Sequence, residues 1–154
     1  MRIGIDARFY GSVGKGLGRY TERLVHELEK IDTENEYSIF LCPENFDEYI
    51  PANPRFTKVL TKSRWYGVAE QLLYPWQLYA NHLDLVHFPH FNVPVLYRRP
   101  LIVTLHDLIL FHYPTEKATT RKSWQYWLKF HVYRFVLTQA LRRARTAITV
   151  SDFT

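Results

Sequence analysis

Short apolar runs alternate along this chain with longer segments whose apolar residues recur at helical spacing. The runs have the length of strands, and they lie at Arg2–Asp6, Tyr37–Cys42, Phe56–Leu60, Leu85–Phe88, Leu101–Leu105 and Thr146–Val150. Several of them are apolar at consecutive positions, which is typical of parallel strands covered by helices on both faces. Helices are predicted at about 17–31, 65–82 and 120–144. This alternation predicts a doubly wound α/β domain with a mostly parallel sheet and helices on both faces.

The predicted helix at 120–144 carries apolar and aromatic side chains on two of its faces. One face holds Trp124, Leu128, His131 and Phe135, and another holds Tyr126, Phe130, Tyr133, Leu137 and Leu141. A helix that is apolar around much of its circumference is expected to be buried between other elements. Three arginines close this segment, at a helix end where cations complement the dipole.

The first predicted strand is followed by a glycine-rich loop, residues 11–18, and then by a helix. This order presents unpaired backbone N–H groups to an anion. The glycine spacing matches neither the Walker A loop nor the G-x-G-x-x-G pattern, so NAD binding is not expected. We predict instead that the glycines of this loop let a diphosphate approach the backbone, with added charge from Lys15 or Arg19. A flexible loop without a ligand is the alternative.

Polar residues also follow two other predicted strands, at the sheet edge where ligands of open parallel sheets bind. His106 comes directly after the strand at 101–105 and can donate a hydrogen bond or take part in proton transfer. Asp107 either orients a loop or forms a turn with His106. A stiff loop with two prolines, residues 88–94, is placed to line a pocket. The histidines here have no standard ligand spacing, so no metal is expected.

Composition narrows the classes of partner. The net charge of +5 favours anionic partners, but the basic residues are dispersed and nucleic-acid binding is not expected. One cysteine, Cys42, excludes an intrachain disulfide and favours a reducing, cytoplasmic location. No signal peptide is expected at the start of the chain. Basic and aromatic residues at 62–66 and 72–76 fit a packed helix better than contact with the inner face of a membrane, which stays open.

Four motifs occur in an order that resembles a known family. They are Asp6-Ala7-Arg8, Gly16-Leu17-Gly18-Arg19-Tyr20, His106-Asp107-Leu108 with Tyr113-Pro114, and Val150-Ser151 followed by Phe153. Together they resemble the amino-terminal domain of family 4, or group 1, retaining glycosyltransferases of the GT-B fold. The resemblance covers nearly the whole chain.

This resemblance implies a single acceptor-side domain over residues 1–154, which faces a donor-binding domain across a cleft. It implies that Gly16 and Gly18 approach the donor diphosphate or the acceptor. His106 would lie near the transferred sugar and support catalysis, and Ser151 matches a position at the cleft edge. No metal or cofactor is implied. The partners would be a nucleotide-sugar and a glycan or lipid-linked acceptor.

The complete enzyme is therefore expected to transfer a sugar, with mannose as a family-level guess, to a hydroxyl acceptor with retained configuration. The resemblance does not extend to the family's second domain, which holds a basic pair and a Glu-x7-Glu motif. Because the charge of the leaving diphosphate must be stabilised, we expect the chain by itself to be inactive. The alternative from another class is a stand-alone, non-catalytic α/β module that binds a phosphorylated ligand or a protein partner.

Overall fold

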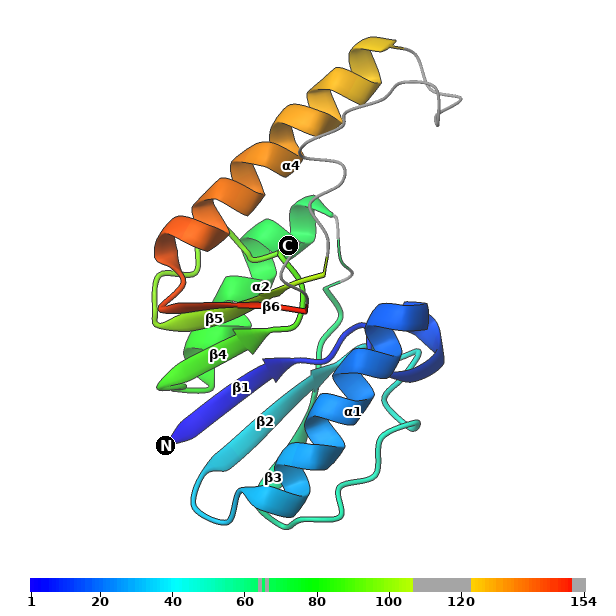
Figure 1. The fold of residues 1–154 in the computed structure, drawn as a ribbon, viewed down its shortest axis with the longest axis vertical. Helices are drawn as coiled ribbons and strands as arrows, with labels where there is room; N and C mark the ends of the chain where they lie inside the picture. Colours follow the sequence, from blue (N-terminus) through cyan, green and yellow to red (C-terminus); the bar gives the residue numbers. More distant parts are fainter. Residues whose placement is uncertain (64, 66, 107–122, 151–154) are drawn as a thin grey trace.

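Six strands form one sheet, and every neighbouring pair is parallel (Figure 1). The computed structural model describes residues 1–63, 65, 67–106 and 123–150. The strand order is β3-β2-β1-β4-β5-β6, which is the order of a doubly wound fold. The strands are β1 (Arg2–Asp6), β2 (Glu36–Leu41), β3 (Phe56–Leu60), β4 (Leu85–Phe88), β5 (Leu101–Leu105) and β6 (Thr146–Thr149). The predicted fold class is confirmed, and each strand lies within one residue of its predicted bounds.

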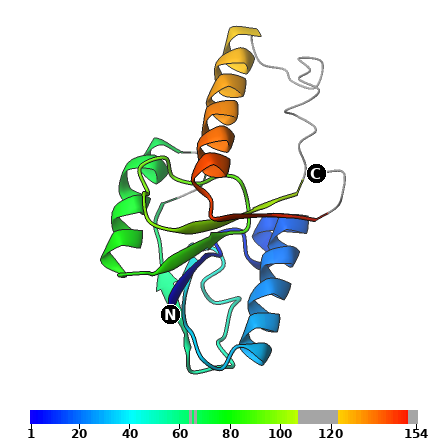
Figure 2. The same ribbon diagram turned by 60° about the vertical axis from the view of Figure 1, so that its left-hand side comes forward.

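Helices cover both faces of this sheet, as predicted (Figures 1 and 2). Helix α1 (Lys15–Ile31) follows a short 3-10 turn, η1 (Gly11–Gly14), and covers one face. Helices α2 (Val68–Ala80) and α4 (Ser123–Arg143) contribute to a single apolar cluster on the other face. Since side chains alternate along each strand, the two faces carry separate cores. Ile5 and Ile39 pack with Val25 of α1, whereas Phe88 and Val103 pack on the opposite side.

Helix α4 is less buried than its apolar sequence predicts. Leu137 and Ala140 are buried against the sheet, but Leu128, Val132 and Phe135 are each more than half exposed. The expectation that α4 is buried between other elements is therefore wrong for its outward face. The physical reason is its position: α4 packs on one side only, and its first half projects past the sheet (Figures 1 and 2). Among the described residues, no helix has both the length and the apolarity needed to cross a bilayer.

Strand β6 also departs from the sequence pattern, because all four of its residues are exposed. It was expected to have helices on both faces. Among the strands that the structure describes, it lies last in the order and pairs with β5 alone, so it is the edge strand of this sheet.

Two leucines of α4 test how this helix is docked. Leu137 is 1% exposed and Leu128 is 57% exposed. Leu137→Ala is expected to lower the free energy of unfolding by about 2–5 kcal/mol, because it opens a cavity in the core. Leu128→Ala makes the same chemical change on the outward face and is expected to cost less than about 0.5 kcal/mol. Urea denaturation of both variants measures the difference, and equal losses would contradict the observed orientation of α4.

Candidate functional site

The carboxyl ends of β1 and β4 lie side by side at the centre of the sheet. From β1 the chain continues to β2 and β3 on one side, whereas β4, β5 and β6 lie on the other. Ligands of open parallel sheets bind in the crevice at such a reversal of strand order. The loops after β1, β3 and β4 come into contact here, so this edge is the place to look for a site.

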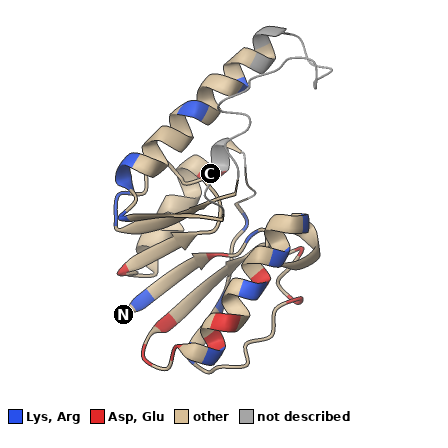
Figure 3. Cartoon of the chain, in the orientation of Figure 1, with Lys and Arg blue, Asp and Glu red and all other residues tan. Residues whose placement is uncertain are grey.

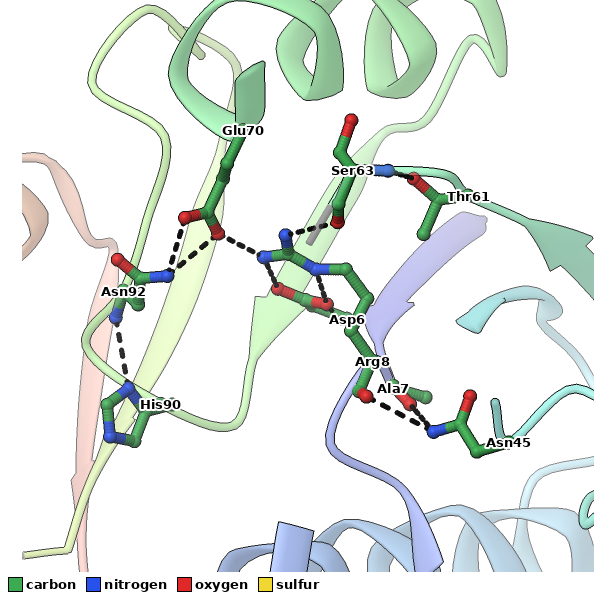
Figure 4. Close-up of polar contacts among 9 residues, drawn as sticks. All are labelled: Asp6, Ala7, Arg8, Asn45, Thr61, Ser63, Glu70, His90 and Asn92. Atoms are coloured by element: carbon green, nitrogen blue, oxygen red, sulfur yellow. Dashed lines mark hydrogen bonds and ion pairs between the residues drawn. The ribbon is translucent and has the colours of Figure 1, made fainter. Parts of the chain in front are cut away.

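A buried arginine, Arg8, joins these loops (Figure 4). Its Nε donates to Oδ1 of Asp6 at 2.7 Å, and its Nη2 donates to Oδ2 of Asp6 at 2.7 Å and to Oε1 of Glu70 at 2.6 Å. Its Nη1 donates to the carbonyl oxygen of Ser63 at 3.1 Å. Asn92 in turn donates from Nδ2 to both oxygens of Glu70, at 2.7 and 2.9 Å. We call these five residues the Arg8 cluster.

The charges of the Arg8 cluster depend on one another because they are buried. Burial by itself would lower the pKa of Arg8, but Asp6, followed by Tyr74 and Glu70, outweighs this effect and holds the pKa well above its usual value. Burial raises the pKa of Glu70, although the Arg8 guanidinium and the Asn92 amide oppose that rise. The guanidinium also lies 4.1 Å from the ring centre of Tyr74 on α2. Such a buried group of charges is stable only while all of its members are paired.

Further contacts fix the backbone of the loop after β1. The side-chain amide of Asn45 donates from Nδ2 to the carbonyl oxygens of Ala7 and Arg8 at 3.1 and 3.2 Å (Figure 4). The same Nδ2 lies 3.1 Å from the carbonyl oxygen of Tyr10. The ring of Phe9 packs on His90, with ring centres 5.5 Å apart. The start of the glycine-rich segment is thereby held against the end of β4.

The glycine-rich segment forms an open cavity at the beginning of α1. It has a volume of about 610 Å³ and is lined by Gly11, Ser12, Lys15, Gly16, Arg19 and Glu22. No side chain within the described residues caps the first turn of α1, and that turn holds no acidic residue. The Lys15 N–H donates to the carbonyl oxygen of Ser12. The helix start without a side-chain cap and the two cations favour an anionic group, whereas the carboxylate of Glu22 can accept from hydroxyl groups. This combination fits a ligand that carries both, such as a phosphorylated sugar.

The structure separates the roles of the two predicted glycines. At Gly18, a Cβ atom would lie 2.1 Å from the carbonyl oxygen of Gly11 and 2.5 Å from that of Phe9, so the close packing of α1 requires a glycine. At Gly16, a Cβ atom would meet nothing within 4 Å and would enter the cavity. Packing therefore does not explain the glycine at position 16.

His106 follows β5 directly and lies beside α1. Its Nε2 is 2.9 Å from the carbonyl oxygen of Pro89, which can only accept, so the proton lies on Nε2 and Nδ1 is the ring's acceptor. Its ring meets the ring of Tyr20 edge to face, with centres 4.7 Å apart. Tyr20 directly follows Arg19, so the structure brings His106 to the same sheet edge as the cavity. A neighbour on β4, His87, is buried, and burial lowers its pKa to about 4.

Two predicted site residues, Asp107 and Ser151, lie outside the described residues. Other expectations can be located. Trp65 packs on the ring of Phe9 with centres 4.7 Å apart, as expected for a packed segment. The same expectation is wrong for Leu72, Leu73 and Trp76, which lie on the outward side of α2 and are more than half exposed. Around the three histidines at 87, 90 and 106, as in the rest of the described chain, no group of acidic, histidine or cysteine side chains could hold a metal ion.

Sequence reasoning missed the partners of Arg8. Asp6 and Arg8 were noted within a motif without a role, and neither Glu70 nor Asn92 was singled out. One signal was present, because Glu70 is the sole charged residue of the apolar segment that forms α2. A lone carboxylate in such a segment indicates a buried partner of opposite charge.

Comparison with known proteins gives one match. Residues 14–154 match the family model described as Glycosyltransferase Family 4. No curated protein and no solved structure matches the chain.

The two glycines allow a paired test of the cavity. Gly18→Ala is expected to lower the free energy of unfolding by about 1–3 kcal/mol, because the added methyl group meets carbonyl oxygens that are fixed by the fold. Gly16→Ala is expected to leave it unchanged or to raise it by up to about 1 kcal/mol, since alanine favours a helix. Urea denaturation measures both. A large loss in Gly16→Ala would show that position 16 has a packing role.

Replacing the central arginine tests the Arg8 cluster. Arg8→Met leaves buried carboxylates without their cation. It is therefore expected to lower the free energy of unfolding by about 3–5 kcal/mol near neutral pH. Glu70 loses an interaction that lowers its pKa, so its pKa rises further and the folded state binds a proton more readily than the unfolded state. The loss in free energy of unfolding, relative to the unsubstituted chain, should therefore become smaller as the pH falls from about 7 toward about 4.5.

Denaturation at several pH values measures this deficit. Arg2→Met is the matched control, because Arg2 is exposed at the other end of β1 and should change little. A deficit for Arg8→Met that is constant with pH would mean that buried carboxylate charge is not its cause.

Proposed function

The chain belongs to glycosyltransferase family 4, and from this membership we propose that it is the acceptor-side domain of a retaining glycosyltransferase. The sugar would come from a nucleoside diphosphate and pass to a hydroxyl of a glycan or lipid-linked acceptor, with mannose as the first sugar to test. The observation that carries the proposal is the cavity at the start of α1, where Lys15 and Arg19 flank Gly16 at a helix start that no described side chain caps. It lies at the sheet edge where doubly wound folds bind ligands.

The cavity would act by charge and by close backbone approach. The first-turn amides of α1 donate to an anionic group of the donor or the acceptor, and the exposed side chain of Arg19 adds a charge-assisted hydrogen bond. Glu22 can accept from a sugar hydroxyl on the same wall. Gly18 would contribute indirectly, by letting α1 approach the loop that frames the cavity.

His106 would contact the transferred sugar. Its Nε2 proton is committed to Pro89, so Nδ1 remains to accept a hydrogen bond from a hydroxyl group. Tyr20 packs against the ring and limits its orientation. Asp107 and Ser151 remain proposed contacts from the family motif. No metal or other cofactor is proposed for this chemistry.

Turnover would need a donor-binding domain that stabilises the leaving diphosphate. We therefore expect the 154-residue chain to bind ligands without transferring sugar.

Nuclear magnetic resonance titration tests this function. The chain, labelled with ¹⁵N, is titrated with GDP-mannose, GDP and a UDP-sugar, and saturable shifts are expected at the amides of Gly16 and Arg19. Arg19→Gln is expected to weaken binding about tenfold, which is the value of one charge-assisted hydrogen bond. Arg23→Gln is the matched control, because Arg23 is exposed one turn later on α1 and does not line the cavity. Absence of shifts at residues 15–19 with every ligand, or equal weakening by both variants, would contradict the proposal.

A transfer assay completes the test. No sugar transfer by the chain alone is expected, and measurable turnover would show that a donor-binding domain is not required.

A further inference from the structure

The outward face of α4 carries an apolar stripe that the fold leaves uncovered. Leu128, Val132 and Phe135 are spaced by four and three residues, which places them on one side of a helix. Each is more than half exposed, although Leu137 on the opposite side is fully buried in the core. The helix is therefore apolar on two opposite faces, of which the sheet uses one. We call the three exposed residues the outer stripe.

The charges around the outer stripe have one sign. Between Ser123 and Arg143 the sequence holds no aspartate or glutamate, and Figure 3 shows only Lys and Arg on the described part of α4. Lys129 and Arg142 on the helix and Arg145 directly after it are all exposed. The bias extends further, because residues 85–154 hold ten Lys and Arg against three Asp and Glu, whereas residues 1–84 hold ten against twelve.

A second apolar set lies on the same side of the sheet. Leu72, Leu73 and Trp76 of α2 are more than half exposed. The loop before β5 connects α2 to α4, because the Tyr79 hydroxyl donates to the carbonyl oxygen of Leu96 and Nη1 of Arg143 donates to that of Val95. Exposed apolar residues thus occur on both helices that cover this face.

We propose that the outer stripe of α4 docks on an anionic lipid surface. Leu, Val and Phe would enter the boundary between headgroups and acyl chains, while the long stems of Lys129, Arg142 and Arg145 let their charges reach the lipid phosphates. Charge complementarity favours this occupant, because a cationic and acid-free helix matches a surface of uniform negative charge. The first half of α4 projects past the sheet, so it can lie along a surface without the sheet intervening (Figures 1 and 2).

This surface is separate from the proposed catalytic site. None of its residues lines the cavity at the start of α1. The proposal goes beyond sugar transfer, and its failure would leave the proposed function untouched.

Vesicle flotation with the full chain tests the proposal. Vesicles of phosphatidylcholine alone are compared with vesicles that also contain phosphatidylglycerol, and partition onto the anionic vesicles is expected, with a decline as salt is added. The triple variant Leu128→Ser, Val132→Ser and Phe135→Ser is expected to lose at least about tenfold in partition. Replacement of Lys129, Arg142 or Arg145 by glutamine, one at a time, is expected to lower partition onto the anionic vesicles about fivefold.

Two controls keep the result interpretable. The double variant Ile31→Ser and Ile50→Ser removes residues that are even more exposed but lie outside the outer stripe, and it should partition normally. Circular dichroism checks that the stripe variant keeps its helix content. Equal binding to neutral and anionic vesicles, or an unchanged stripe variant, would overturn the proposal. So would self-association that the stripe variant abolishes without vesicle binding, because a second copy would then cover the face.

Discussion

A guanidinium group with no exposed surface is stable only if the carboxylates and carbonyl oxygens around it replace the water it has lost. Arg8 meets this condition through Asp6, Glu70 and Ser63, which come from the end of β1, the start of α2 and the loop after β3. Asn92 extends the same pairing to the loop after β4. The sheet edge that carries the candidate site therefore has its shape because these charges must find one another during folding.

The glycine-rich segment depends on that edge. Its loop is held by Asn45 and by the packing of Phe9, so the start of α1 approaches the end of the sheet closely. Gly18 makes this approach possible because no Cβ could fit between α1 and the carbonyl oxygens of the loop. Gly16, two residues earlier, faces open space. Gly18 is thus required by packing, whereas Gly16 is not and borders the cavity.

The chain also divides by charge. Its first half is close to neutral and contains the cavity, and its second half is strongly basic and contains α4. Both features favour negatively charged partners, but of different kinds: a small ligand in the cavity, and an extended surface along the outer stripe. A glycosyltransferase family 4 domain with this arrangement has two separate surfaces whose charge suits negatively charged partners.

The sequence by itself determined the strands, the helices and the parallel sheet, because apolar periodicity is a local property that each segment carries. For the same reason the glycine-rich segment and His106 could be assigned to the carboxyl edge before the structure was known. Only the tertiary structure decided that Glu70 pairs with Arg8, 62 residues away, and that Asn92 pairs with Glu70, 22 residues away, because these groups are brought together by packing that no local pattern encodes. It also decided that the apolar outward face of α4 stays exposed. Burial depends on which neighbours an element receives, and α4 received them on one side alone.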